Sequence, residues 1–151
     1  MIIMIAIVLV IGAPIVGAAE LPQADYSSLT QLIRDLPPGV SKKNPFIDTT
    51  PYIGKRIIVD GALHNRYPFG TRFMVTIWCR VPTKYSDSGT KVIDAEFDPN
   101  DEAIAIIEAM KLDDQIKISG KIKQMSGLRT SPFLRLSDCI LLNPTPRPKT
   151  P

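Results

Sequence analysis

The sequence has few of the residues that build metal centres and catalytic sites. It contains one histidine, His64, and two cysteines, Cys79 and Cys139, which lie far apart in the chain. Zinc sites need three or four ligands at short spacing, so this composition excludes a histidine-rich or cysteine-rich metal site. The nine glycines are scattered singly, so no phosphate-binding glycine loop occurs. The sequence therefore predicts no metal, no cofactor and no catalytic residue.

Neither positive nor negative charge is in large excess. The 18 basic and 15 acidic side chains leave a net charge of +3, which is too small to require a polyanionic partner. The distribution is uneven, because acidic residues gather between 94 and 114 and basic ones predominate on either side. The paired carboxylates of Asp113 and Asp114 are expected in a turn before the fourth strand, and His64 in a solvated loop after the first.

The first residues form the only long apolar run. Residues 1–19 are apolar and end in small residues at 16–19, which predicts a secretory signal peptide cleaved after Ala18 or Ala19. The protein is therefore expected to be exported, either periplasmic or secreted. No Lys or Arg precedes the run, so an uncleaved N-terminal membrane anchor is the alternative, and membrane contact is expected only in that case. No cysteine follows the run, which excludes a lipid-anchored cysteine.

The rest of the chain divides into three segments. Residues 20–51 are expected to hold a short helix and a connector, with the helix at 26–36 and Asp25 as its N-cap. Residues 52–142 form the folded domain. Residues 143–151 alternate proline with polar residues, which predicts a disordered tail.

The folded domain alternates apolar and polar residues in five segments, which predicts five strands. They are expected at 56–63, 71–81, 92–97, 115–122 and 133–142. A helix should follow the third strand, capped by Asp98, with an apolar side formed by Ala103, Ile104, Ile107 and Met110.

Two glycines hold equivalent places in the first and fourth strands, Gly61 and Gly120. A glycine inside a strand is typical of a sharp bend or of a close approach between backbones, and a tightly coiled small barrel needs both. With the strand order β-β-β-α-β-β, these features predict a mainly β protein. Its fold is a five-stranded OB-fold barrel with one helix between strands 3 and 4, plus a short N-terminal helix.

Three short segments carry a resemblance to a known family: Tyr52-Ile53-Gly54-Lys55, Asp114-Gln115-Ile116 through Gly120, and Leu134 to Ile140. They resemble an extracytoplasmic OB-fold family described as similar to the tRNA-anticodon-binding OB domain. The resemblance covers roughly residues 44–142 and implies the fold rather than an activity. The family often has a second cysteine where this chain has Ile122 or Ala95, so the family's disulfide is not carried over.

Cys79 and Cys139 have two interpretations. An even number of cysteines in an oxidising compartment suggests a disulfide, worth roughly 4 kcal/mol for a loop of this length. Alternatively, they are two separately buried thiols. Cys79 alternates with the apolar residues of its strand, so its burial is expected in both cases.

The predicted binding surface is the outer face of strands two and three with the loops at 64–71 and 124–131. OB-folds that bind oligonucleotides or oligosaccharides use these elements. Exposed aromatic rings beside basic side chains are typical of sites for single-stranded nucleic acid. The candidate ligand-binding residues are Trp78, Arg80, Arg72, Thr76, Arg66, Tyr67, Phe69, Arg129 and Lys123.

Two carboxylates on the same face oppose a nucleic-acid ligand. Asp94 is expected opposite Trp78, and Glu96 opposite Thr76. There they would repel phosphates and pair with the arginines of the second strand, Arg80 and Arg72.

The function expected is therefore non-enzymatic binding. The partner is an unknown envelope or extracellular protein, or a small or oligomeric ligand. Single-stranded nucleic acid on the same face is the alternative, possible but not favoured, and an uncharacterised enzyme comes third.

Overall fold

A computed structural model describes residues 20–37, 48–85, 89–128 and 131–142. The predicted signal segment, most of the connector after the first helix, the proline-rich tail and Arg129 lie outside these ranges.

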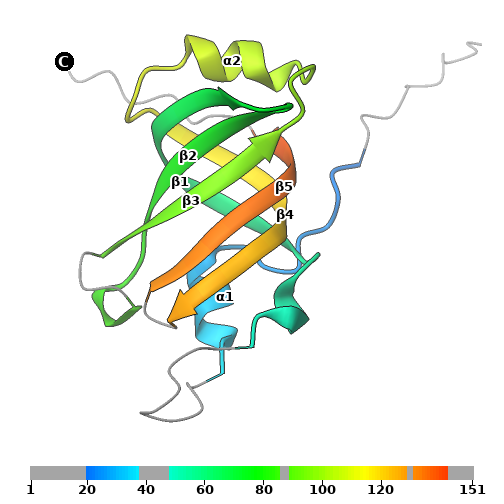
Figure 1. Ribbon diagram of the computed structural model, residues 1–151. Helices are drawn as coiled ribbons and strands as arrows, with labels where there is room; N and C mark the ends of the chain where they lie inside the picture. Colours follow the sequence, from blue (N-terminus) through cyan, green and yellow to red (C-terminus); the bar gives the residue numbers. More distant parts are fainter. Residues whose placement is uncertain (1–19, 38–47, 86–88, 129–130, 143–151) are drawn as a thin grey trace, which may run out of the picture.

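Five strands close into a barrel in the order β1-β2-β3-β5-β4 (Figure 1). β3 and β5 pair in parallel and every other neighbouring pair is antiparallel. This confirms the predicted OB-fold. The strands are β1 (Arg56–Phe69), β2 (Arg72–Arg80), β3 (Thr90–Phe97), β4 (Gln115–Leu128) and β5 (Ser131–Leu142).

The long strand β1 changes partner near its middle. Residues Arg56 to Ala62 pair with β4, and Ala62 to Phe69 pair with β2. Gly61 lies at this change, where a Cβ atom would stand 2.4 Å from the carbonyl oxygen of Trp78. The backbone of β2 therefore leaves no room for a side chain at position 61, as predicted for a coiled barrel strand.

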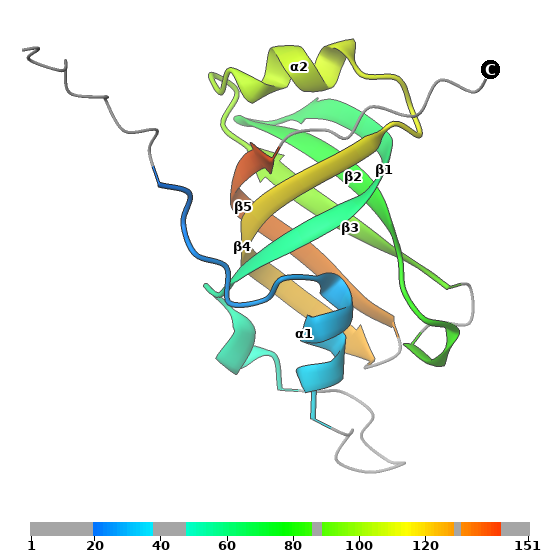
Figure 2. The same ribbon diagram turned by 180° about the vertical axis from the view of Figure 1, so that it is seen from behind.

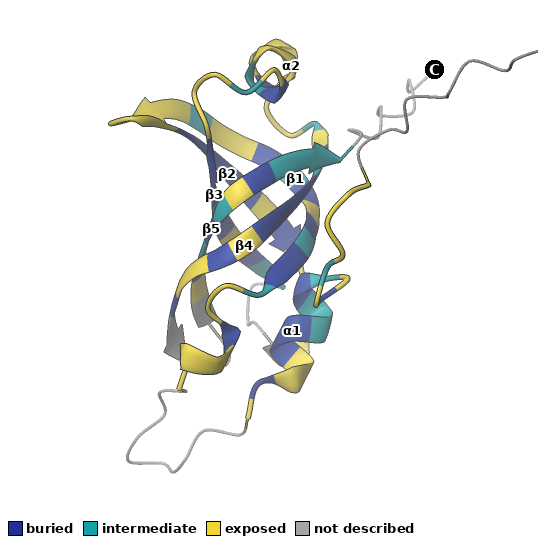
Figure 3. Ribbon diagram, turned by 90° about the vertical axis from the view of Figure 1, so that its right-hand side faces the viewer, coloured by how far each residue is buried: buried dark blue, intermediate teal, exposed yellow. Residues whose placement is uncertain are grey.

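The two helices cover opposite ends of the barrel (Figures 1 and 2). α2 (Ala103–Ala109) buries Ile107 at one end, and α1 (Leu29–Asp35) buries Leu32 and Ile33 at the other. Figure 3 shows that the buried residues of each helix face the barrel. The apolar side predicted for the second helix is confirmed.

The predicted cap of the first helix was wrong. α1 is capped by Ser28, whose Oγ accepts a hydrogen bond from the Gln31 N–H at 3.1 Å. Asp25 accepts instead from the Arg56 N–H at 2.7 Å, and Tyr26 forms a parallel bridge with Ile57. The segment before the helix is thus used to extend the sheet beside β1, which delays the start of the helix.

The second helix also begins later than predicted. Asp98 is not its cap, because the Asp98 carboxylate accepts a hydrogen bond from the Asn100 N–H at 2.9 Å in a local turn. The Asp101 carboxylate accepts similarly from the Ala103 N–H at 2.9 Å. Asp side chains stabilise such turns in competition with helix, so these residues precede α2 instead of opening it.

Both predicted binding loops are largely strand. β1 continues through His64 to Phe69, and the chain turns at Gly70, which has a left-handed φ of 58°. β4 likewise continues to Leu128. Aromatic residues such as Tyr67 and Phe69 favour extended backbone, and pairing with β2 extends the hairpin beyond the predicted end.

Candidate functional site

The outer face of β2 and β3 has a different pairing from the predicted one. Trp78 pairs with Val92, and Asp94 pairs with Thr76 instead of Trp78. The outward-facing residues were predicted correctly, but each residue of β2 pairs with a residue of β3 two positions before the predicted one. The connection between the strands includes a 3-10 turn at Thr83–Tyr85, and turn geometry sets the pairing of a hairpin.

The two carboxylates of this face have partners other than the predicted Arg80 and Arg72. Glu96 contacts Lys123 Nζ at 2.7 Å and Arg135 Nε at 3.9 Å, and its side chain is only 7% exposed. Asp94 lies 3.8 Å from Arg135 Nη2 and accepts a hydrogen bond from Thr76 Oγ1 at 3.1 Å. Two cations from β4 and β5 therefore balance two carboxylates from β3.

Four side chains form a row across four neighbouring strands, which we call the apolar row: His64, Trp78, Val92 and Phe133. The His64 imidazole stacks on the Trp78 indole with centroids 4.0 Å apart and planes at 14°. Ile93 of β3 pairs with Leu134 of β5 in the parallel ladder. Val92 and Phe133 each lie one residue before this pair, so they are neighbours on the outer face.

The apolar row is open to solvent. Trp78 is 42% exposed, Val92 47% and Phe133 38%. Arg135 Cζ lies 5.6 Å from the centre of the Phe133 ring, so a cation borders one end of the row. Adjacent exposed apolar side chains rimmed by polar ones are typical of interaction sites. The predicted loop position of His64 was wrong, because this residue lies in β1 against Trp78, although it is exposed as expected.

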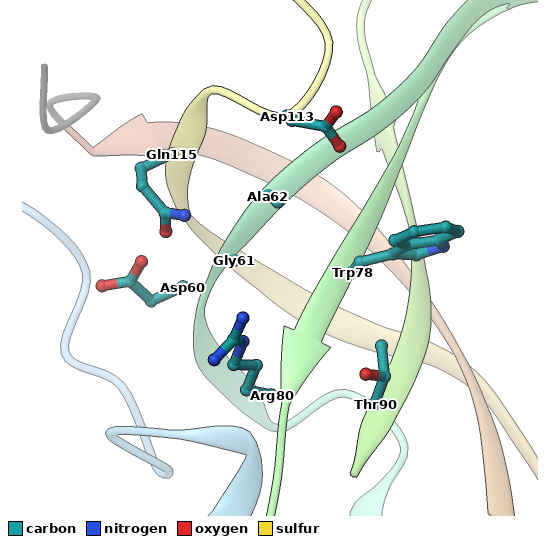
Figure 4. Close-up of a pocket in the computed structure, with 8 residues that line it drawn as sticks. All are labelled: Asp60, Gly61, Ala62, Trp78, Arg80, Thr90, Asp113 and Gln115. Atoms are coloured by element: carbon teal, nitrogen blue, oxygen red, sulfur yellow. The ribbon is translucent and has the colours of Figure 1, made fainter. Parts of the chain in front are cut away.

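A groove of ≈ 650 Å³ lies beside the apolar row, over β1 (Figure 4). Gly61 and Ala62 form its floor, and six side chains surround them in the close-up. The surrounding residues are Asp60, Trp78, Arg80, Thr90, Asp113 and Gln115. Sequence reasoning identified only Trp78 and Arg80 of this group.

The other predicted binding residues do not gather around Trp78. Tyr67 and Phe69 share its face but lie towards the hairpin tip, with ring centroids 6.3 Å apart in an edge-on pair. Arg72 stands at the far end of β2, 3.9 Å from Asp98. Arg66 pairs with the inward-facing Val75 and so lies on the opposite face.

Thr76 and Lys123 instead contact the two carboxylates of β3, Asp94 and Glu96. Thr76 is buried and donates to Asp94, and Lys123 contacts Glu96. Of the eight predicted residues that the structure describes, only Trp78 and Arg80 line the groove together.

Cys79 and Cys139 are free, buried thiols, which is the second of the two alternatives considered from the sequence. Burial raises the pKa of each thiol to about 12, and the nearby Asp60 carboxylate adds to the effect at Cys79. Both therefore stay protonated and unreactive at neutral pH.

Asp113 and Asp114 occupy the predicted turn before β4. The Asp113 N–H donates to the Leu63 carbonyl at 2.7 Å, and the Leu63 N–H donates to the Asp114 carbonyl at 2.9 Å. The turn is thereby fixed against the middle of β1. This contact places the Asp113 side chain at the rim of the groove.

The fold and this face place the chain among the OB-fold proteins. One similar solved structure is a "putative nucleic acid-binding lipoprotein" from Klebsiella pneumoniae subsp. pneumoniae, 16% identical, with a TM-score of 0.51. The match covers 80% of this chain and 92% of that one. Another is an OBody bound to hen egg-white lysozyme, 14% identical with a TM-score of 0.45, covering 82% of this chain and 99% of that one.

No protein-family model and no curated protein sequence matches the chain. The narrower resemblance to the tRNA-anticodon-binding-like family therefore stays a prediction. Within the described ranges, no helix has the length and apolar character needed to cross a membrane.

Proposed function

We propose that this protein is an exported OB-fold module that acts by binding, with the apolar row as the centre of its recognition surface. The observation that carries the proposal is the exposure of Trp78, Val92 and Phe133 side by side on adjacent strands. Such a row on the ligand face of an OB-fold supports recognition of an apolar or aromatic group on a partner.

The proposed partner is uncharged where it meets this face. The cations Arg135 and Lys123 are already matched by Asp94 and Glu96, so they offer little attraction to a polyanion. The partner is accordingly an extracytoplasmic protein or a small or oligomeric ligand that presents apolar or neutral groups.

A binding role without catalysis is supported by the positions of the histidine and the two cysteines, the residue types that catalysis most often uses. His64 stacks on Trp78, and Cys79 and Cys139 are buried with raised pKa values. Among the described residues, no three His, Cys, Asp or Glu side chains gather to hold a metal ion. Export is supported by the apolar segment at 1–19.

Single-stranded nucleic acid is the second candidate. It is favoured by Trp78 beside Arg80 and by Arg135 over the Phe133 ring, since stacking rings next to cations suit such ligands. The name of the Klebsiella protein points the same way. His64 already occupies one face of the indole, so a base would have to stack on the other face.

Tryptophan fluorescence tests the choice, because Trp78 is the only tryptophan. The protein is titrated with oligo-dT at low and moderate salt. We expect no saturable quenching, whereas phosphate binding with base stacking would give quenching that weakens steeply with salt. Saturable, salt-sensitive quenching would refute the uncharged partner and support the second candidate.

Amide chemical-shift mapping tests the location. The probes are a neutral oligosaccharide, an extended uncharged peptide and oligo-dT. We expect one of the first two to shift resonances around Val92 and Phe133, and Val92→Asp to abolish the shifts. Ile106→Asp is the matched control, because Ile106 is 50% exposed on α2, away from this face. Shifts that map elsewhere would reject the apolar row.

A further inference from the structure

We infer that the groove over Gly61 and Ala62 is a saccharide-binding site, which deepens the proposed function by naming the ligand class. The groove has two kinds of wall, a tryptophan ring on one side and polar side chains on the others (Figure 4). A sugar ring presents C–H groups on its faces and hydroxyl groups around its edge. The two parts of the groove match these two parts of the ligand.

The floor is set by the coiling of β1. Ala62 pairs with Trp78 on β2 and with Gln115 on β4, so a single methyl group lies between an indole and an amide. The hollow above it, ≈ 650 Å³, lies within the range of small-molecule sites. A larger side chain at position 62 would occupy the hollow without entering the core, because Ala62 is only partly buried and Gly61 is its inward neighbour.

The polar wall offers both acceptors and a donor. The carboxylates of Asp60 and Asp113 accept hydrogen bonds, the Arg80 guanidinium donates, and the Gln115 amide does both. Within the described ranges, none of these four side chains has a hydrogen-bonding or ion-pair partner. A hydroxyl both donates and accepts, so one polyhydroxylated ring can satisfy groups of both kinds.

The charges of this wall select against anionic ligands, because the two carboxylates of Asp60 and Asp113 outnumber the Arg80 guanidinium and repel phosphates. A neutral ligand avoids this repulsion, and an amine is tested as a separate probe below. The site therefore differs from the second candidate function, in which Arg80 would contact a phosphate.

Trp78 supplies the apolar wall and joins the groove to the apolar row. His64 stacks on the indole without lining the groove, which holds the ring in place while Trp78 still borders the hollow. From Trp78 the row continues over Val92 to Phe133. A chain of sugars with one unit in the groove would place its next units on these exposed side chains, so the ligand is an oligosaccharide.

The test is a fluorescence titration with three neutral hexasaccharides, maltohexaose, cellohexaose and chitohexaose, with hexalysine and oligo-dT as contrasting probes. We expect a saturable change of Trp78 emission with at least one hexasaccharide and with neither contrasting probe. Ala62→Leu should weaken that binding by about tenfold or more, because the leucine occupies the hollow. Ala105→Leu, on an exposed position of α2, is the matched control and should leave it unchanged.

Three outcomes would overturn the saccharide site: no response to any hexasaccharide, a response that survives Ala62→Leu, or hexalysine binding that Ala62→Leu removes. The last would show an amine site instead. These results leave the proposed function standing if a peptide still binds and Val92→Asp abolishes that binding. If no probe of either kind depends on Ala62 or Val92, both proposals fail.

Discussion

Replacing Gly120 by alanine tests the packing that closes the barrel. Gly120 lies in β4 opposite Ile57, and its φ is outside the left-handed region, so alanine fits the backbone conformation. The added Cβ atom would stand 2.8 Å from Cys139 Sγ, 3.0 Å from Leu136 Cβ and 3.3 Å from Leu136 Cδ1. The cost is therefore steric, and overpacking of this kind is worth roughly 1–3 kcal/mol.

The source of the cost can be separated with a second substitution. Cys139→Ala removes the nearest atom, and alone it should destabilise modestly by leaving a small cavity. The double variant should be more stable than the two single effects predict, with a coupling of roughly 0.5–3 kcal/mol. Urea unfolding of the four proteins measures it, since a small single domain is expected to unfold in two states. Additive effects would show that the Sγ contact is not the source.

Gly61 provides the contrast within the same fold. There the nearest atom to an added Cβ is the Trp78 carbonyl oxygen at 2.4 Å, followed by Ile77 Cγ2 at 2.8 Å and the Trp78 carbonyl carbon at 3.0 Å. Backbone atoms cannot be removed by mutation, so Gly61→Ala should cost more than Gly120→Ala, and truncation of Ile77 should recover only part of the cost. Equal costs at the two positions would refute the distinction between backbone and side-chain crowding.

Four further measurements follow from the structure. Ser28→Ala removes the cap of α1 and should cost about 1 kcal/mol in urea unfolding, and no change would reject Ser28 as the cap. Glu96→Gln leaves Lys123 without a charged partner and Arg135 with Asp94 alone, and it should cost roughly 1–3 kcal/mol, while the exposed Asp98→Asn should cost less than about 0.5 kcal/mol. Without reductant, both cysteines should resist labelling when folded and take two labels once unfolded, and an unlabelled product would indicate a disulfide. Since burial raises both thiol pKa values from 9.0 to about 12, their contribution to stability should be complete below pH 9 and lost as the pH rises towards 12.

Strand alternation predicted the barrel because it reports directly on burial. One face of every strand must point into the core, so Ile93, Ala95 and Phe97 were identifiable without knowing any partner strand. The two strand glycines were informative for the same reason, since each marks a place with no room for a side chain. These features depend on the local chain and one general property of barrels.

Pairing between strands was harder to predict because it depends on connections. The observed β2–β3 register differs from the predicted one by two residues, so Asp94 pairs with Thr76 instead of Trp78. The partners of Glu96 come from β4 and β5, which reach β3 only through the parallel closure of the barrel. The sequence places Lys123 and Arg135 far from Glu96 in the chain, so it holds no local signal of this cluster.

The apolar row illustrates the same limit at the candidate site. The alternation of apolar and polar residues over 92–97 is enough to place Val92 on the outward side of its strand, and Trp78 was predicted on the outer face. Their contact, and the addition of His64 and Phe133, required the pairing of four strands. A prediction from sequence therefore finds the members of a face more readily than the site they form.

The groove and the barrel have a common structural cause, which affects how the ligand should be inferred. β1 must leave β4 and join β2 at Gly61 and Ala62, and at Gly61 the Trp78 carbonyl oxygen leaves no room for a side chain. A hollow above the crossing thus follows from barrel closure, so its presence alone says little about a ligand. The side chains around it are not required by the fold, because Asp60, Arg80, Asp113 and Gln115 are exposed and contribute no core packing. Their combination of hydrogen-bond acceptors and donors beside Trp78 is therefore the part of the site that specifies what binds.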